Sequence, residues 1–114
     1  MESIGKTHEN RDIFMIKVEA DEIADPGSRK KAILMTGAHH SRELVSVQMP
    51  LFMLLDLLHG FVHNDPEKML LLAKNKYFII PMVNVDGSFT IYDQYEKTGE
   101  LVLKRKNNDR RFEG

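Results

Sequence analysis

Cysteine is absent from the 114-residue sequence. Its absence excludes a disulfide framework, a thiolate metal site and a cysteine nucleophile, although it leaves the cellular compartment unknown. An excess of charge of either sign is missing too, because 16 Lys and Arg stand against 17 Asp and Glu and the formal net charge is -1. Nothing in the overall charge therefore indicates binding to nucleic acid or to an anionic membrane surface.

Long hydrophobic runs are also missing. The most apolar stretch, residues 49–58, is too short to cross a bilayer and contains Pro50 and Asp56. Residues 1–11 are polar and contain no apolar segment of the kind found in signal peptides. We therefore expect a soluble chain without a membrane-spanning segment.

The composition that is present fits one small globular domain and no more. Hydrophobic residues make up 42% of the chain and charged residues 29%, an ordinary balance for a globular protein. A local basic run lies near the C-terminal end: Lys104, Arg105, Lys106, Arg110 and Arg111, set against Asp109 and Glu113. On charge alone, such a run is typical of a solvated tail.

Three strands are predicted, at residues 12–20, 32–36 and 77–83. The first is rich in β-branched and aromatic residues, and the other two are short apolar runs typical of strands buried on both faces. We expect the first two to be antiparallel neighbours. Residues 25–28 (DPGS) would form the turn between them, because Pro fixes φ and Gly permits a positive φ.

Two helices are predicted between the second and third strands. Apolar residues recur at helical spacing in the first of them: Val47, Leu51, Leu54, Leu55 and Leu58. We place this helix from Ser46 to Gly60, which leaves Pro50 in its first turn, where a missing amide is tolerated. The second helix is predicted over 66–74, with Asp65 as its N-cap.

The segment after the third strand has weaker signals. Residues 84–87 (NVDG) are predicted to form a turn, and residues 88–114 a long loop. The order strand, strand, helix, helix, strand indicates an α/β fold with a partial mixed sheet and helices packed on it. So few elements leave a sheet edge and a sheet face uncovered, which favours an incomplete domain.

One cluster of residues has metal-binding chemistry. His40 and Glu43 stand three residues apart directly after a buried strand, where ligand sites collect in α/β sheets. An imidazole nitrogen and a carboxylate oxygen are both good Zn²⁺ ligands. Taken alone, the pair is more often a chance occurrence or a helix cap than a metal site.

Four segments, in order along the chain, resemble motifs of the carboxypeptidase A/B-type zinc metallopeptidases. Residues 4–13 (IGKTHENRDI) resemble the segment that leads into the family's first strand, and residues 37–43 (GAHHSRE) resemble its zinc motif. Residues 80–87 (IPMVNVDG) are similar to the family's P-x-x-N-P-D-G, and residues 104–108 (KRKNN) resemble its R-K-N/T segment. Together these segments indicate the N-terminal portion of one zinc carboxypeptidase-like domain, incomplete within residues 1–114.

The resemblance implies roles for individual residues. His40 and Glu43 would be zinc ligands, since only His40 stands three residues before Glu43, and His39 would help to shape the loop. Arg42 would line the substrate cleft, and Arg105 would polarise the scissile carbonyl, a role that suits a permanently charged guanidinium. The implied function is zinc-dependent hydrolysis of the C-terminal peptide bonds of peptides or proteins.

The family's remaining machinery lies downstream of these motifs. The third zinc ligand, the pair that binds the substrate carboxylate, the mobile Tyr and the general-base Glu have no counterpart in this sequence, and Val85 stands where the family has Pro. We expect this portion to be inactive by itself. The alternative is a non-catalytic family remnant that binds peptides or a protein partner through its exposed sheet face.

The other histidines give no second metal site. His59 and His63 are four residues apart, but we expect Gly60 to end the helix between them and leave them at a helix end and in a loop. His8 is expected to lie on the surface before the first strand.

Overall fold

The computed structural model describes residues 1–23, 27 and 29–109. Its elements, in chain order, are β1 (Glu2–Lys6), β2 (Asp12–Val18), the 3-10 helix η1 (Asp21–Ile23), β3 (Lys31–Thr36), α1 (Val45–Val62), α2 (Pro66–Lys74), β4 (Asn75–Ile80) and α3 (Val85–Thr98). Of the predicted turn at 25–28, only Gly27 is described, and its φ of 83° is the positive value expected there. Arg110 and Arg111 of the basic run lie outside the described residues.

The four strands form one mixed sheet in the order β1-β2-β4-β3. β2 pairs with β1 and with β4 in antiparallel orientation, whereas β3 and β4 are parallel. The prediction that the strands now seen as β2 and β3 are neighbours is therefore wrong, because β4 lies between them. β4 occupies an interior position in the sheet and is the most buried strand, with Tyr77 5% and Ile79 0% exposed.

β1 was not predicted. All five of its residues are exposed, and the strand carries neither an apolar run nor a clear alternation. It lies at one edge of the sheet, and its pairing with β2 is irregular between Ser3 and Gly5. A short, polar, irregular edge strand is poorly suited to pairing with other chains, and it leaves little pattern in the sequence.

The helices α1 and α2 follow the sequence prediction closely. α1 runs two residues beyond Gly60, because this glycine packs against Lys68 of α2 instead of ending the helix. α2 has the predicted bounds, and the Asp65 side chain accepts hydrogen bonds from the amides of Glu67 (2.9 Å) and Lys68 (3.1 Å). The N-cap assignment at Asp65 is thereby confirmed.

The carbonyl group of Ser46 in α1 lies close to Gly37 and has no amide partner at Pro50. Pro50 lies inside α1 and has no amide to bond the carbonyl of Ser46 four residues before it. A Cβ atom on Gly37 would lie 2.2 Å from that carbonyl oxygen and 2.6 Å from the carbonyl oxygen of Pro81. Only glycine therefore allows the end of β3 to approach α1 so closely.

α3 replaces the N-terminal part of the long loop predicted at 88–114, so that prediction is wrong for residues 88–98. The Asn84 side chain accepts a hydrogen bond from the amide of Gly87 (3.0 Å), and Gly99 ends the helix with a φ of 71°. Only Asp86, Gly87 and Ile91 are buried in it. Polar and charged residues dominate this helix and few of its side chains are buried, so no apolar run marks it in the sequence.

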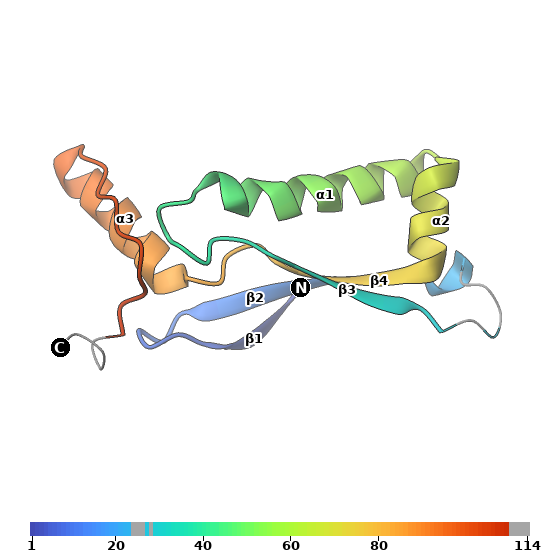
Figure 1. Cartoon of the computed structure of the whole chain (residues 1–114), viewed down its shortest axis with the longest axis horizontal. Coiled ribbons are helices and arrows are strands. Elements are labelled where there is room, and N and C mark those ends of the chain that lie inside the picture. Colours follow the sequence, from blue (N-terminus) through green and yellow to red (C-terminus); the bar gives the residue numbers. More distant parts are fainter. Residues whose placement is uncertain (24–26, 28, 110–114) are drawn as a thin grey trace.

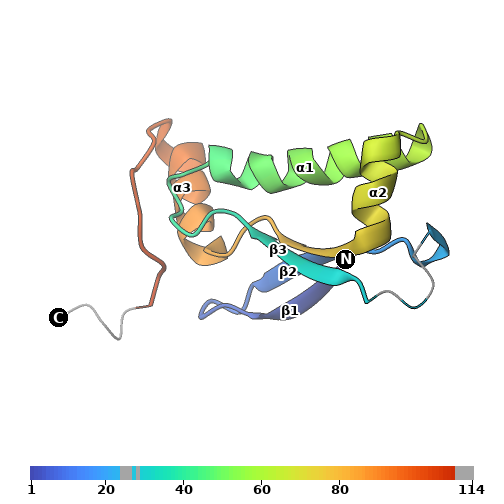
Figure 2. The same cartoon turned by 45° about the vertical axis from the view of Figure 1, so that its right-hand side comes forward.

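The core lies between the sheet and the helices α1 and α2, and comprises Ala20, Leu57, Leu72, Tyr77 and Ile79. Both helices lie on one side of the sheet, and the described residues place no α-helix on the other side (Figures 1 and 2). Leu34 of β3 is 64% exposed, which matches the uncovered face expected from the sequence.

α1 exposes much of its apolar surface. Large side chains such as Phe52 (62% exposed) and Leu55 (64%) contact no other element closely enough to be buried. Among the described residues α1 is also the one helix that is long and apolar enough to cross a membrane, and 17% of its residues are buried. The core helices of soluble proteins share this length and composition, so the property by itself assigns no location to α1.

Candidate active site

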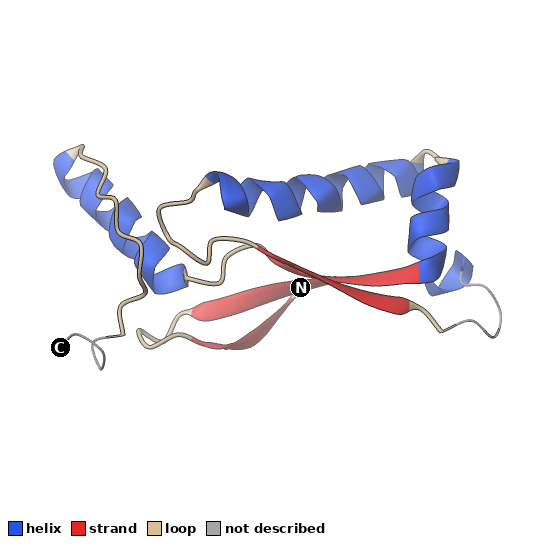
Figure 3. Cartoon of the chain, in the orientation of Figure 1, coloured by secondary structure: helices blue, strands red, loops and turns tan. Residues whose placement is uncertain are grey.

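Two loops meet at one end of the sheet. Residues 37–44 follow β3 and residues 81–84 follow β4. Because these strands are parallel, their carboxyl ends lie at the same end of the sheet (Figure 3). Backbone hydrogen bonds join the loops: Val83 donates to the carbonyl of Gly37 (3.0 Å) and Asn84 to that of Ala38 (2.9 Å). Ligand sites of α/β folds are commonly found at the carboxyl ends of the strands.

The structure brings the two predicted metal ligands together. Nδ1 of His40 lies 2.9 Å from Oε1 of Glu43, so the pair converges as the spacing predicts. The side chains are 37% and 51% exposed and open to solvent. Successive turns hold the loop, since the Glu43 amide donates to the His40 carbonyl (3.0 Å) and Ser46 Oγ donates to the Glu43 carbonyl (2.5 Å).

The geometry of this pair fits a zinc ion. Two ligands of a tetrahedral zinc with bonds of about 2.0–2.1 Å lie about 3.3 Å apart, so the pair needs to open by only a few tenths of an ångström. Over residues 1–23, 27 and 29–109, no group of three or more His, Cys, Asp or Glu side chains is placed to hold a metal. The described chain thus offers two ligands, and a third would have to come from elsewhere.

The remaining histidines are occupied differently. Nε2 of His39 hydrogen-bonds Thr36 Oγ1 (2.8 Å) at the end of β3 and does not join the pair. The rings of His59 and His63 stack with centroids 4.1 Å apart at the far end of α1, and the helix continues through Gly60, contrary to the sequence prediction. His8 is half exposed and pairs with Asp109 (2.9 Å).

The predicted arginines differ in how the fold places them. Arg42 lies in the loop of residues 37–44, called the metal loop below because it carries His40 and Glu43, and its side chain is exposed. Arg105 follows α3 in the chain, and its backbone contacts the metal loop. Its carbonyl accepts hydrogen bonds from the amide of Ser41 (3.3 Å) and from Nδ2 of Asn84 (3.3 Å). The chain from 88 to 103 therefore folds back toward this loop, and the role of the Arg105 side chain stays a prediction.

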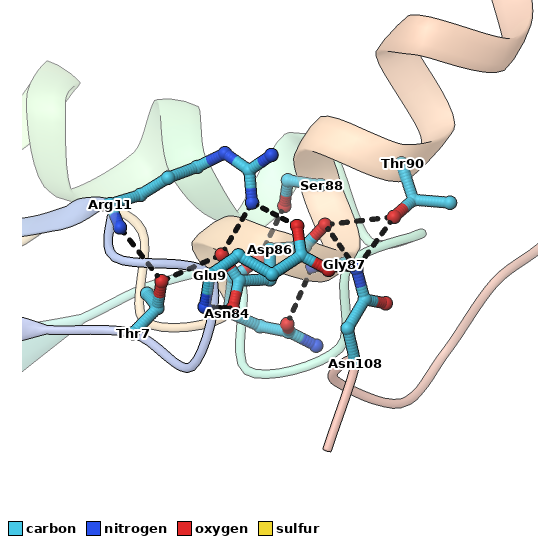
Figure 4. A network of polar contacts seen from close by, with 9 residues as sticks. All are labelled: Thr7, Glu9, Arg11, Asn84, Asp86, Gly87, Ser88, Thr90 and Asn108. Carbon is cyan, nitrogen blue, oxygen red and sulfur yellow. Dashed lines mark hydrogen bonds and ion pairs between the residues drawn. The ribbon is translucent and has the colours of Figure 1, made fainter. Parts of the chain in front are cut away.

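A polar network beside this site was not predicted from the sequence (Figure 4). Its centre is Asp86, 3% exposed, which accepts hydrogen bonds from Thr7 Oγ1 (2.7 Å), the Glu9 amide (3.1 Å) and Arg11 Nη1 (2.7 Å). Nδ2 of Asn108 adds bonds to Glu9 Oε1 (2.6 Å) and to the Asp86 carbonyl (3.3 Å). Residues of three of the four motif segments thus converge here, and the joint occurrence of these segments was the one signal in the sequence that could have indicated such contacts.

The network sets the ionisation of its carboxylates. Burial acts to raise the pKa of Asp86, but the hydrogen bonds from Thr7, Arg11 and the Glu9 amide outweigh it and hold that pKa below its ordinary value. The pKa of Glu9 is lowered mainly by its hydrogen bond with Arg11, and further by Asn108. Both carboxylates are therefore charged at neutral pH and tie the β1–β2 turn to α3.

A cavity of about 250 Å³ is lined by residues of this network and of the metal loop. Thr7 and His8 of the β1–β2 turn, His39 of the metal loop, Asn84 and Asn107 are among the residues that line it. The turn, both strand-end loops and the C-terminal segment therefore surround one concave surface.

Comparisons with known proteins agree with these features. The profile of the family described as "Zinc carboxypeptidase" matches residues 1–114. A "Zinc carboxypeptidase" from Saccharothrix mutabilis subsp. capreolus is 33% identical over 107 residues, which cover 94% of this chain and 23% of that protein. An "Inactive metallocarboxypeptidase ecm14" from Talaromyces marneffei is 28% identical over 92 residues, covering 80% of this chain and 15% of that protein.

Solved structures share the fold. The chain superposes on thrombin activatable fibrinolysis inhibitor with a TM-score of 0.75 at 24% identity, covering 93% of this chain and 24% of that one. A metallo-carboxypeptidase from Burkholderia cenocepacia gives a TM-score of 0.60 at 22% identity, covering 76% of this chain and 22% of that one. The chain spans about a quarter or less of the length of these relatives.

Proposed function

Because this chain belongs to the zinc carboxypeptidase family, we propose that it supplies part of the active site of a zinc-dependent carboxypeptidase that hydrolyses C-terminal peptide bonds. The observation that carries the proposal is the 2.9 Å approach of His40 Nδ1 to Glu43 Oε1 at the end of β3. The backbone of Arg105 docks on the same loop, and this docking supports a shared site.

In this proposal each residue has a distinct task. His40 and Glu43 hold the metal, which when bound supplies Lewis acidity and a nucleophilic water. Arg105 stabilises the negative charge that develops on the scissile carbonyl oxygen, and Arg42 contacts the substrate peptide. A third ligand and a general base would be contributed by other residues, so the described chain holds only part of the machinery.

The metal assignment is tested by calorimetric titration of the 114-residue chain with zinc chloride. We expect weak one-to-one binding, because two protein ligands give low affinity, and we expect His40→Ala and Glu43→Gln each to abolish it. His39→Ala is the matched control, since it removes the adjacent imidazole that bonds Thr36 instead. Unchanged binding by His40→Ala, or loss of binding by His39→Ala alone, would contradict the assignment.

A second candidate function follows from relatives whose names describe them as inactive. In that case the chain binds peptides or a protein partner without hydrolysis. The two functions are distinguished by assaying the release of C-terminal residues from a peptide panel, with and without zinc, in a protein that also contains the third zinc ligand. For the 114 residues alone we expect no release. Chelator-sensitive turnover by them would overturn the proposal that a third ligand and a general base come from other residues.

A further inference from the structure

We propose that Ser41 and Asn84 are positioning residues that clamp the main chain of residues 104–106 onto the metal loop and so fix Arg105 beside His40 and Glu43. The inference rests on the proposed function for the role of Arg105. The clamp itself is built from contacts of the described residues.

Ser41 forms the first half of the clamp. It lies between the two proposed ligands in sequence and is 0% exposed. Its Oγ donates to the carbonyl of Lys104 (2.8 Å) and its amide donates to the carbonyl of Arg105 (3.3 Å). One residue of the metal loop therefore holds two successive carbonyl groups of a segment more than 60 residues away in the chain.

Asn84 forms the second half and uses its two side-chain atoms for different tasks. Oδ1 accepts from the amide of Gly87 (3.0 Å) and caps α3. Nδ2 donates to the carbonyls of His39 (3.3 Å) and Arg105 (3.3 Å). The amide group thus joins the metal loop, the start of α3 and the Arg105 segment.

Gly87 provides an independent sign that this contact is closely fitted. A Cβ atom at this position would lie 2.7 Å from Ser41 Oγ, 2.7 Å from Asn84 Oδ1 and 2.8 Å from the carbonyl oxygen of Lys106. No side chain larger than hydrogen fits there. The first turn of α3 can therefore approach the 104–106 segment only because residue 87 is glycine.

The clamp matters because no contact among the described residues fixes the side chain of Arg105. Its side chain is exposed, and no residue within 1–23, 27 and 29–109 forms a hydrogen bond or an ion pair with its guanidinium. A donor that stabilises an oxyanion has to stand about 3 Å from the reacting oxygen. The anchored backbone is what restricts the volume that this side chain can reach, and small misplacements are costly in such sites.

Trypsin offers a direct readout, because residues 104–106 are Lys, Arg and Lys. The clamped carbonyls of Lys104 and Arg105 are those of two bonds that trypsin cleaves, so the segment must leave Ser41 and Asn84 before cleavage. The assay follows cleavage at 104–106 in the 114-residue chain by mass spectrometry, relative to cleavage after Lys97, which is 69% exposed. Global unfolding raises both rates, whereas release of the clamp raises only the first.

Asn84→Asp separates the clamp from the helix cap. Asp keeps an oxygen for the Gly87 amide and favours a helix N-terminus, but it places an acceptor where Nδ2 donated to two carbonyls. We expect relative cleavage at 104–106 to rise about 5- to 10-fold, and Ser41→Ala to raise it similarly. Ser88→Ala is the matched control, since Ser88 Oγ bonds the Asn84 carbonyl (2.9 Å) and not the segment.

Equal relative cleavage in the parent chain, Ser41→Ala and Asn84→Asp would overturn the clamp. If Ser41→Ala does not fold, Asn84→Asp decides alone, and equal increases in cleavage at 104–106 and after Lys97 assign Asn84 to the helix cap and also overturn the proposal. The assay contains no metal. A failure of zinc binding at His40 and Glu43 is thus seen separately, as a failure of the proposed function.

Discussion

Replacing Asp86 by Ala gives the sharpest test of the polar network. The carboxylate is 3% exposed and accepts hydrogen bonds from Thr7 Oγ1, the Glu9 amide and Arg11 Nη1. Hydrogen bonds to a charged group contribute about 1.5–3 kcal/mol each, and their sum is reduced in this network because Thr7 and Arg11 can regain water. We expect a loss of about 3 kcal/mol in the free energy of unfolding.

That loss is large for a chain of this size. A 114-residue domain is stable by about 6–17 kcal/mol, and a urea dependence of about 1.5 kcal/mol/M converts 3 kcal/mol into a fall of about 2 M in the denaturation midpoint. Urea titration followed by circular dichroism at 222 nm measures the shift, with the dependence on urea checked to be equal in both proteins.

Asp93→Ala is the matched control on the same helix. Asp93 is 43% exposed and pairs with Lys97 four residues later (2.7 Å), a surface pair worth about 0.5 kcal/mol or less. If Asp86→Ala lowers the midpoint no more than Asp93→Ala does, the network does not stabilise the fold, and the stabilising role of Asp86 is refuted.

Three further predictions concern acid stability, core packing and a close backbone contact. Because the pKa of Asp86 is depressed in the folded state, its contribution is present above the ordinary aspartate value of 3.8 and is lost as pH falls through the lower folded value, so the acid limb of a stability–pH profile should be flatter in Asp86→Ala. Leu57→Ala, at a 2% exposed position, should cost about 2–5 kcal/mol of unfolding free energy, whereas Leu55→Ala, at 64%, should cost less than about 0.5, and similar urea midpoints would contradict the assigned core. Gly37→Ala should lower the thermal midpoint more than Gly99→Ala, which has open space around it and costs about 1 kcal/mol for its positive φ; the reverse order would contradict the contact with α1.

Local patterns determined the parts of the fold that depend on neighbours in sequence. The bounds of α2 followed from Asp65 and Pro66, whose preferences act within one helical turn. The helical spacing of apolar residues located α1 to within two residues at its C-terminal end, and the apolar run located β4. The three-residue spacing of His40 and Glu43 predicted their convergence for the same reason, since i and i+3 share one turn of chain.

Tertiary structure decided what depends on residues far apart in the chain. The sheet order and the start of α3 carry little local signal, because partners more than 60 residues away in the chain stabilise them. The edge strand β1 pairs with its sequence neighbour β2, and it carries little signal because all its residues are exposed and no apolar run marks it. Asp86 shows the difference most clearly: the sequence placed it in a turn, and only the fold brought Thr7 and Arg11 to its carboxylate. Hydrogen-bond partners of this kind depend on how distant elements pack against one another. The spacing of residues within one segment does not determine that packing.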